Sequence, residues 1–328
     1  MKRVFGTLLF GLGVVFIVLA VGLPLYVAPA VTKLPYDLEP TSSLVVAKNV
    51  TFLDVDTGKA TTPMGNLESL TEVVPQKKKT NNLQSQFQDN AVVWSVYTTT
   101  WRTDTKKVIS KGSTELALER VSGAAVNWKD AWADDPSNKV NFSGQVYKFP
   151  FHTEKKDYPF WDPQLGNSNF PAKFQGVDTV KGMEVYRFEQ TVPMTKLQAK
   201  PEQIAFLTSQ FAPAGTTGGE MWYSNTRTFW VEPTTGQYLN LRERRNMELR
   251  WSGGMQTLLK GDFVYADSTV DKAVETAGSN KSLINTVRLY APIGLGAGGL
   301  LFMIVGAVLA RSPGVRRSRH AADSEYLD

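Results

Sequence analysis

The sequence predicts a mainly β (α+β) domain, a large antiparallel sheet or barrel-like domain with a few helices, flanked by two transmembrane α-helices. An uncharged apolar run lies near each end of the 328-residue chain, and these two runs predict the helices. Between them, short stretches rich in Val, Tyr, Phe, Trp and Thr alternate apolar with polar residues, which is typical of strands with one buried face. The expected parts are a cytoplasmic N-terminus (1–3), a first span (4–28), the β-rich domain (29–288), a second span (289–310) and a basic tail (311–328).

The first span depends on a run without charge. No charged residue occurs from Val4 to Thr32, and the apolar segment VFGTLLFGLGVVFIVLAVGLPLYV has 24 residues. A helix needs about 20 apolar residues to cross the hydrocarbon layer. A cleaved secretory signal is the alternative, because Ala28-Pro29-Ala30 resembles a cleavage site, but the apolar core of such a signal is only roughly 7 to 15 residues long. An uncleaved anchor is therefore the favoured interpretation.

The region between the spans contains several strand patterns. The runs SLVVAKNVTFLDVDTG, AVVWSVYTTTWR, GMEVYRFEQTV and GDFVYADSTV predict strands. Two further strand-like runs flank Pro233-Thr234-Thr235-Gly236, which predicts a hairpin because proline favours the start of a turn and glycine accepts a positive φ. The polar stretch Leu67–Asp89, with three consecutive lysines, predicts a solvated loop. Attraction of anionic headgroups or wall polymers is the alternative for those lysines.

One helix is expected inside the β-rich domain, over PEQIAFLTSQF. Pro201 suits a first helical turn, and Ile204, Leu207 and Phe211 fall on one face. The following APAGTTGG has the composition of a flexible connector. The helix can pack on the sheet as part of the core, or it can act as a lid or a partner contact.

The second span is LYAPIGLGAGGLLFMIVGAVLA, 22 residues without charge, followed by RSPGVRRSRH. Basic residues before the first span and after the second place both termini in the cytoplasm by the positive-inside rule, and the domain between them outside the plasma membrane. Gly294, Gly298 and Gly306 predict close packing of this helix against the first span, because small residues let membrane helices approach each other.

The composition excludes several kinds of site. The chain has no cysteine, and therefore no disulfide, thiolate nucleophile or thiolate zinc site. His152 is the only histidine outside the tail, and neither a G-x-S-x-G motif nor a metal-binding helix motif is present. The segment Asp54–Gly58 resembles the start of a calcium loop, but Gly65 stands where the final carboxylate is needed. An acid pair that includes Asp162 stays open, because sequence spacing does not give the distance between carboxyl groups.

We therefore expect no enzyme, no metal and no cofactor. The net charge of +5 comes mostly from the two termini, where the membrane explains it, and no nucleic-acid partner is expected.

The most aromatic stretch is KFPFHTEKKDYPFWDP, Lys148–Pro163. Its prolines disfavour helix, and its charged centre TEKKD must reach water. We expect two extended arms with inward-facing rings, joined by a solvated turn. Phe151, Tyr158, Phe160 and Trp161 are the candidate lipid contacts, and burial of these rings in the core is the other interpretation.

The order of these parts resembles a family of actinobacterial membrane proteins of unknown function, often labelled porin PorA family protein. The pieces that carry the resemblance are MKR with a glycine-rich first span, KFPF, YPFWD, RTFWVEPTTG, and a second span with an arginine tail. The resemblance implies a membrane-anchored envelope protein and supplies no catalytic residues. The layout is also similar to that of class B scavenger receptors, which implies a β-rich ectodomain through which lipids pass.

Three functions stay open at this point. The first is binding or conveying of lipids or glycolipids through the ectodomain, with membrane and envelope lipids as partners. The second is a non-catalytic scaffold or accessory subunit that docks a membrane-protein partner, such as an envelope-biogenesis enzyme or transporter. The third is an oligomeric porin, which requires several copies because two helices alone enclose no channel.

Overall fold

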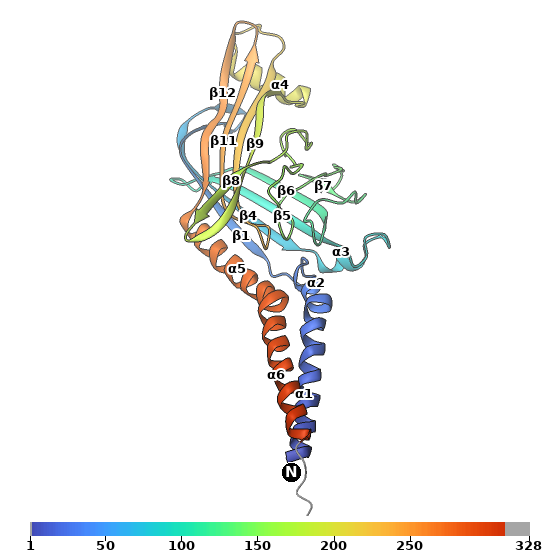
Figure 1. Ribbon diagram of the computed structural model, residues 1–328. Coiled ribbons are helices and arrows are strands. Elements are labelled where there is room, and N and C mark those ends of the chain that lie inside the picture. Colours follow the sequence, from blue (N-terminus) through green and yellow to red (C-terminus); the bar gives the residue numbers. More distant parts are fainter. Residues whose placement is uncertain (1, 312–328) are drawn as a thin grey trace, which may run out of the picture. The chain divides into compact units, whose positions relative to one another are not determined.

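The computed structural model describes residues 2–311, and Figure 1 shows their course. The described chain divides into two compact units. One comprises the residues up to Ala30 together with those from Leu283 onward, and the other is Val31–Ser282. Most of the predicted tail 311–328 lies outside the described residues.

The helical unit contains the two apolar runs. Its elements are α1 (Lys2–Gly22), a π-helical turn (Leu23–Val27), most of α2 (Ala28–Val31), a second π-helical turn (Thr286–Tyr290) and α6 (Ala291–Arg311). The stretches Lys2–Val31 and Asp267–Arg311 are long and apolar enough to cross a membrane. Pro24 explains the first π-helical turn, because its ring removes a backbone donor and disturbs the regular ladder.

Helices α1 and α6 pack through two glycine pairs. A Cβ on Gly13 would lie 2.6 Å from the carbonyl oxygen of Gly299, and a Cβ on Gly306 would lie 2.7 Å from that of Gly6. No side chain larger than hydrogen fits at these points. Within each helix the two glycines are seven residues apart, which is about two helical turns and keeps both on one face.

The structure places the three predicted packing glycines differently. Gly306 lies in the contact, whereas a Cβ on Gly298 would lie at an ordinary 3.8 Å from the ring of Phe16. A Cβ on Gly294 would meet nothing within 4 Å. The helices contact each other through glycines seven residues apart, and not through the G-x-x-x-G spacing of Gly294 and Gly298.

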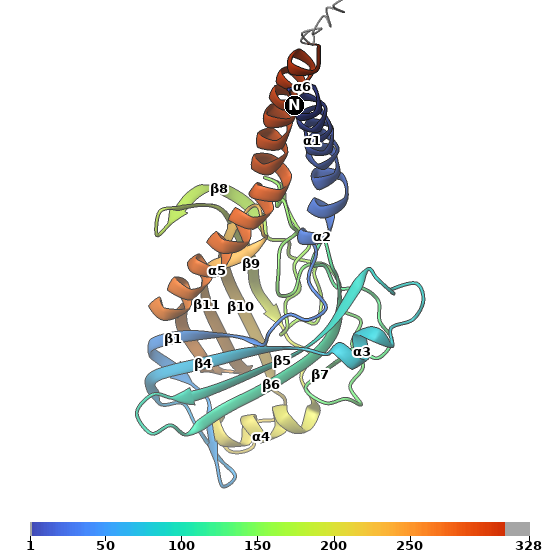
Figure 2. The ribbon, with the colours of Figure 1, turned by 90° about the horizontal axis from the view of Figure 1, so that it is seen from below.

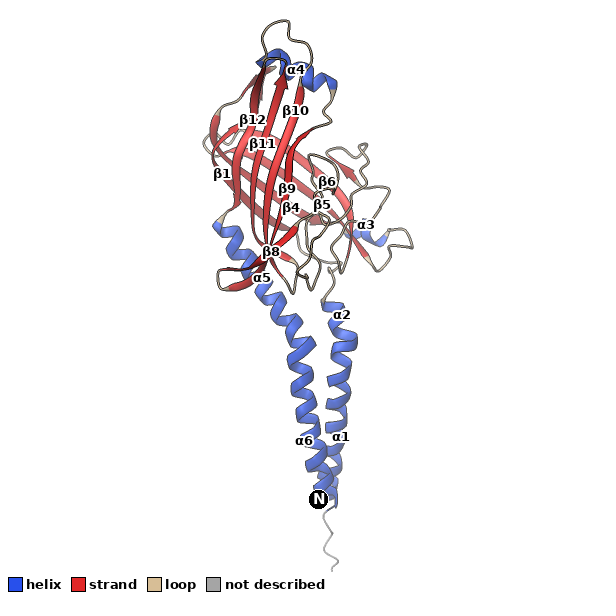
Figure 3. Cartoon of the chain, turned by 45° about the horizontal axis from the view of Figure 1, so that its top comes forward, coloured by secondary structure: helices blue, strands red, loops and turns tan. Residues whose placement is uncertain are grey.

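The β-rich unit is built on one ten-stranded sheet, with strand order β7-β6-β5-β4-β1-β12-β11-β10-β9-β8. All its pairings are antiparallel. Figure 3 shows that the sheet is strongly curved and twisted. Its strands are β1 (Thr41–Phe52), β4 (Met64–Pro75), β5 (Ala91–Arg102), β6 (Val108–Glu119), β7 (Trp132–Ala133), β8 (Lys173–Val180), β9 (Met183–Lys196), β10 (Glu220–Glu232), β11 (Gln237–Trp251) and β12 (Gly254–Tyr265). A separate two-stranded ribbon consists of β2 (Asp54–Asp56) and β3 (Lys59–Thr61).

The large antiparallel sheet confirms the predicted fold class, and several elements match in detail. The expected hairpin joins β10 to β11, with Gly236 at φ 70°. The predicted helix is α4 (Pro201–Phe211), which begins at its proline. Figures 1 and 2 both show α4 at one end of the strands β9 to β12.

The predicted loop at Leu67–Asp89 is wrong over its first part. Strand β4 continues to Pro75 and pairs with β1 on one side and β5 on the other. Its polar residues are compatible with a strand because they have partners: Glu68 accepts hydrogen bonds from Trp101 Nε1 (2.7 Å) and Lys106 Nζ (3.1 Å). The lysines begin the short helix α3 (Lys77–Asn81).

The sequence also missed a helix after β12. The run GDFVYADSTV leaves the sheet at Tyr265, and α5 (Asp267–Asn285) begins two residues later. Val270, Ala273 and Ala277 pack against Val185 and other sheet residues. An apolar face made mostly of small residues gives a weak helical pattern, which explains why the helix was not recognised.

The long segment between β7 and β8 forms much of the core. Phe142 and Trp161 from this segment, together with Trp128 just before β7, pack with residues of β5 and β6. Phe149, Tyr158 and Phe160 pack with residues of β9 and β10. The segment therefore joins the cores on the two halves of the sheet.

Candidate functional site

The aromatic stretch has the local form that the sequence predicts. Residues 154–157 are exposed and form the solvated turn between two arms. On the second arm, Tyr158, Phe160 and Trp161 are 7%, 2% and 6% exposed, and on the first arm Phe151 is partly buried. The rings therefore face inward.

The rings of this stretch are packed against other rings. Phe149 stacks on Phe188 at 4.6 Å between ring centroids, Phe160 lies 4.4 Å from Phe229, and Trp161 lies 4.9 Å from Phe142. Such contacts are worth about 0.5–1.5 kcal/mol each beyond area burial. The structure thus assigns these side chains to core packing, and their role as lipid contacts stays a prediction.

The stretch is attached to the β10–β11 turn by a buried lysine. Lys148 is 7% exposed, and its Nζ donates to the carbonyl oxygens of Phe149 (2.8 Å) and Thr235 (2.6 Å). Burial lowers the pKa of Lys148 to about 7, against the opposing influence of Glu232 and Glu119.

Backbone contacts complete this attachment. The Phe149 N–H donates to the Gly236 carbonyl at 3.0 Å, and the Thr153 N–H donates to the Pro233 carbonyl at 2.7 Å. A Cβ on Gly236 would overlap the carbonyl oxygens of Phe149 and Pro150. The two stretches KFPF and EPTTGQ, far apart in the sequence, therefore form one packed unit.

A buried charge network lies on the same sheet. Arg227 makes an ion pair with Glu243 and donates to Gln190 Oε1 at 2.8 Å. Nearby, Asp162 is fully buried, accepts the N–H groups of Gln164 (2.9 Å) and Leu165 (3.0 Å), and lies 3.3 Å from the Tyr223 hydroxyl. The carboxylate that sequence spacing left open as a catalytic acid thus holds a loop in place.

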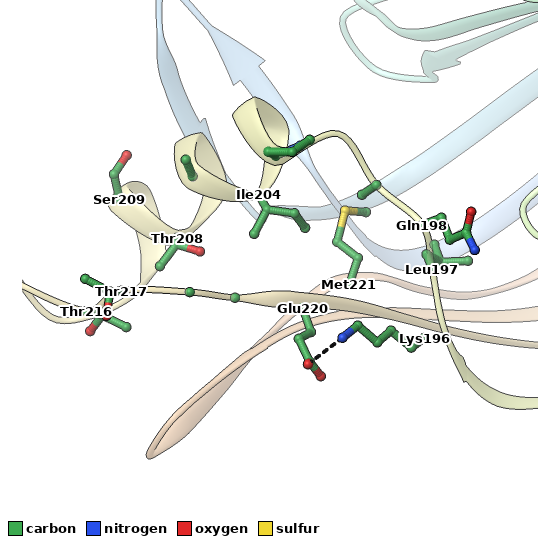
Figure 4. Close-up of a pocket in the computed structure, with 15 residues that line it drawn as sticks. Lys196, Leu197, Gln198, Ile204, Thr208, Ser209, Thr216, Thr217, Glu220 and Met221 are labelled. Atoms are coloured by element: carbon green, nitrogen blue, oxygen red, sulfur yellow. Dashed lines mark hydrogen bonds and ion pairs between the residues drawn. The ribbon is translucent and has the colours of Figure 1, made fainter.

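A pocket of about 760 Å³ lies beside α4, between the end of β9 and the start of β10. Its apolar lining residues are Leu197, Ala199, Pro201, Ile204, Ala205 and Met221. Figure 4 shows Ile204 and Thr208 of α4 above the strand that carries Glu220 and Met221. The connector after α4 contributes Thr216, Thr217, Gly218 and Gly219.

Seven of the 15 residues that line the pocket are polar, and two of these seven are paired with each other. Lys196 Nζ lies 2.7 Å from Glu220 Oε1, and the hydrogen bond from Lys196, followed by one from Trp222, lowers the pKa of Glu220. Thr208 is 5% exposed, and its Oγ1 has no hydrogen-bond partner among the described residues. A Cβ on Gly219 would overlap that hydroxyl, so glycine is needed beside it. The pocket therefore combines an apolar surface with one ion pair and the polar side chains of Gln198, Ser209, Thr216 and Thr217.

The sequence indicated this site only indirectly. The amphipathic pattern of Pro201–Phe211 and the glycine-rich connector allowed a lid, but no residue of the pocket was named as a binding residue. None of Phe151, Tyr158, Phe160 and Trp161 lines the pocket. The size of a pocket depends on the separation of elements, which a local pattern does not report.

Comparison with known proteins gives the family. Residues 5–308 match the family model described as Porin PorA. A protein named Porin PorA from Corynebacterium resistens (strain DSM 45100 / JCM 12819 / GTC 2026 / SICGH 158) is 24% identical, over 98% of this chain and 99% of its own length. Another Porin PorA, from Corynebacterium amycolatum, is 25% identical over 75% of this chain and 78% of its own.

Among solved structures, the crystal structure of LprF from Mycobacterium bovis matches over 76% of this chain and 91% of its own, at 15% identity and a TM-score of 0.18. A match of that TM-score carries no structural argument. The family model, in contrast, covers nearly the whole chain. The chain belongs to the Porin PorA family.

Proposed function

We propose that this is a membrane-anchored protein of the cell envelope whose β-rich unit binds the apolar part of a lipid in the pocket beside α4. The observation that carries the proposal is the pocket itself, about 760 Å³ with an apolar lining. Ligand pockets typically measure about 300–1,000 Å³ and are mostly apolar with a few polar groups. Each Å² of apolar surface removed from water contributes about 25 cal/mol to the free energy of binding, which favours a hydrocarbon ligand.

The polar groups of the pocket support binding and not catalysis. Lys196 and Glu220 neutralise each other, and a catalytic acid or base needs a pKa near the working pH, whereas the ion pair keeps Glu220 ionised. The Thr208 hydroxyl is buried, so the apolar lining is what would hold a bound lipid. Our proposal therefore includes no reaction.

The proposed setting is the plasma membrane, with both termini in the cytoplasm and the β-rich unit outside. Lys2 and Arg3 precede the first apolar run, and Arg311 follows the second. Positive charges at these positions favour retention on the cytoplasmic side. The pocket would then serve lipids on the outer side of this membrane, including envelope lipids and glycolipids.

The test is native mass spectrometry of the full-length protein, gently extracted from the cells that make it. Wild-type protein should carry a stoichiometric lipid, and Ala205→Phe should lose it because the new ring fills the pocket. Gln203→Phe is the matched control, since Gln203 is exposed on the same helix and is not among the residues that line the pocket. Lipid retained on Ala205→Phe, or only background lipid on the wild type, would contradict the proposal.

A second proposal is pore formation, which rests on the family and on the names of the two relatives. No Asp, Glu, Lys, Arg or His lies between Val4 and Ala30 or between Leu289 and Ala310, so the helices of one copy offer no charged pathway. A pore would therefore need several copies. Reconstitution of purified protein into planar bilayers checks this, and stepwise conductance that depends on protein concentration is the expected result. A silent bilayer containing correctly folded protein argues against it.

A further inference from the structure

A second, smaller pocket of about 200 Å³ lies on the sheet at strands β8 to β11. It shares no residue with the pocket beside α4. Its lining is entirely polar apart from one indole, and consists of Gln175, Arg187, Glu189, Thr228, Trp230, Arg242 and Arg244. It is the pairing register that gathers these residues from four strands.

The register places the side chains in three successive rows. Glu189, Thr228 and Arg242 are opposite one another on β9, β10 and β11. Arg187 is opposite Trp230 in the row on one side, and Arg244 is opposite Thr226 in the row on the other side. Because residues directly opposite in a sheet point to the same face, these groups converge on one patch.

The arginines of this patch are incompletely paired. Arg242 makes an ion pair with Asp262. Among the described residues, neither Arg187 nor Arg244 makes an ion pair. The row of Thr228 and Arg242 lies between the rows of Arg187 and Arg244, so an anion bound over that middle row would be attracted by the positive charges on both sides. Guanidinium groups match the geometry of phosphate oxygens by paired hydrogen bonds.

A carboxylate also lines the pocket without neutralising these arginines. Glu189 makes no ion pair among the residues that the structure describes, and its Oε1 accepts only a long 3.3 Å hydrogen bond from Thr191. A free carboxylate is a strong acceptor for hydroxyl groups and repels a bare anion. The amide of Gln175 and the hydroxyl of Thr228 add further hydrogen-bonding groups, and Trp230 supplies an apolar wall.

We propose that this pocket binds a phosphate ester of a polyol, with Arg187 and Arg244 on the phosphate and Glu189 on the hydroxyl groups. The same chemistry occurs in a free polyol phosphate and in the headgroup of a glycerol-based or sugar-based phospholipid. The residues of this site do not line the α4 pocket. The proposal for this site is therefore independent of whether the α4 pocket binds an acyl chain.

The test is calorimetric titration of the full-length protein in detergent micelles. The probes are inorganic phosphate, glycerol 3-phosphate, short-chain phosphatidylglycerol and short-chain phosphatidylcholine. Glycerol 3-phosphate should bind more tightly than inorganic phosphate, and raised salt should weaken both. If phosphatidylglycerol also binds and phosphatidylcholine does not, the source is a lipid headgroup; if only the free ester binds, the source is soluble. Absence of binding for glycerol 3-phosphate and phosphatidylglycerol would overturn the proposal.

Three variants make the assignment specific. Arg187→Gln and Arg244→Gln should each weaken glycerol 3-phosphate binding by about tenfold or more, as expected for loss of a charge-assisted hydrogen bond. The matched control is Arg250→Gln, since Arg250 is also on β11 but is paired with Glu248 (2.7 Å) and lies outside the pocket. Equal weakening by Arg250→Gln would overturn the site.

Glu189→Gln distinguishes the contribution of the ligand's phosphate to binding from that of its hydroxyl groups. Removing this negative charge should raise the affinity for inorganic phosphate while lowering the preference for glycerol 3-phosphate over phosphate. An unchanged preference would overturn the role of Glu189. Arg187 and Arg244 are exposed, so their variants should leave the melting temperature nearly unchanged.

Discussion

The aromatic cluster around Phe149 and the pocket beside α4 both rest on strands β9 and β10, yet one is sealed and the other is open. Around Phe149, rings of Phe160, Phe188 and Phe229 fill the space at 4.4–5.8 Å between centroids. Beside α4 the lining includes Ala199, Ala205, Gly218 and Gly219, and about 760 Å³ stays unfilled. The comparison teaches that the size of the side chains packed beside the same two strands decides whether an apolar surface becomes core or binding space: the rings fill the space, whereas the small residues of α4 and its flanking connectors do not.

The largest expected effect comes from Gly236→Ala in the sealed region. The residue has φ 70°, and a Cβ there would overlap the carbonyl oxygens of Phe149 and Pro150. We expect a loss above about 4 kcal/mol in the free energy of unfolding, which is an exceptional value for one substitution. The measurement is urea unfolding of the full-length protein in detergent micelles.

The control for that prediction is Gly166→Ala. Gly166 has a similar φ of 64°, but a Cβ there would meet nothing within 4 Å. It should lose only about 1–2 kcal/mol, the cost of a left-handed conformation without overlap. Equal losses in the free energy of unfolding for Gly236→Ala and Gly166→Ala would show that the contact between KFPF and EPTTGQ does not contribute to stability.

Trp161→Ala should have the next largest effect. The indole is 6% exposed and packs on Phe142, so its removal leaves a cavity and should cost about 3 kcal/mol. Thermal unfolding combined with lipid analysis of the purified protein checks this. A variant that melts cooperatively at the wild-type temperature but loses its lipid would instead make Trp161 a binding residue.

A pH effect is expected from Lys148. The pKa of this amine is about 7 in the folded protein and 10.5 in its ordinary state, so from about pH 7 to 10.5 the unfolded chain holds a proton that the folded chain lacks. Stability therefore rises with pH over this window, by roughly 2 kcal/mol between pH 7 and pH 9 for a single group. Unfolding curves at the two pH values measure it.

Lys148→Met serves as the comparison for that pH effect, because methionine keeps much of the length and has no proton to lose. This variant should show a smaller rise in stability between pH 7 and pH 9 than the wild type. The same rise in both proteins would assign the effect to other groups.

The smallest effect should come from Thr208→Val in the open region. The Thr208 hydroxyl has no partner among the described residues, so the substitution should be neutral or stabilising by up to about 1 kcal/mol. Thr235→Val is the matched change in the sealed region, where Oγ1 donates to Glu232 Oε2 at 2.8 Å, and it should cost about 1–2 kcal/mol. A loss at Thr208 as large as that at Thr235 would mean that the pocket is packed like the core.

The sequence predicted elements whose pattern is local. The alternation in AVVWSVYTTTWR predicted the strand β5. Pro233 and Gly236 predicted the turn between β10 and β11. The charged residues of TEKKD gave the exposed turn at 154–157. In each case the burial pattern or the required φ depends on residues that are close together in the chain. A short stretch of sequence is therefore enough to predict the element.

What the sequence did not predict depends on residues far apart in the chain. Strand β4 is stabilised by two neighbouring strands, which outweigh its polar composition. The smaller pocket arises only because the register sets Arg187 opposite Trp230 and Glu189 opposite Thr228. The α4 pocket is a volume that side chains leave unfilled, and no short pattern encodes it.

The two outermost strands of the sheet bear on how copies of this protein can associate. An unpaired strand edge is a template for strand addition, and proteins protect such edges with short strands, bulges and charges. Strand β7 has only two residues, and β8 carries a register irregularity between Phe174 and Gly176 as well as the charged residues Lys173 and Asp178. Neither edge is suited to continuous pairing with a second copy. Any assembly of this protein would therefore be joined through side-chain surfaces or through its helices, and not by extension of one sheet into another.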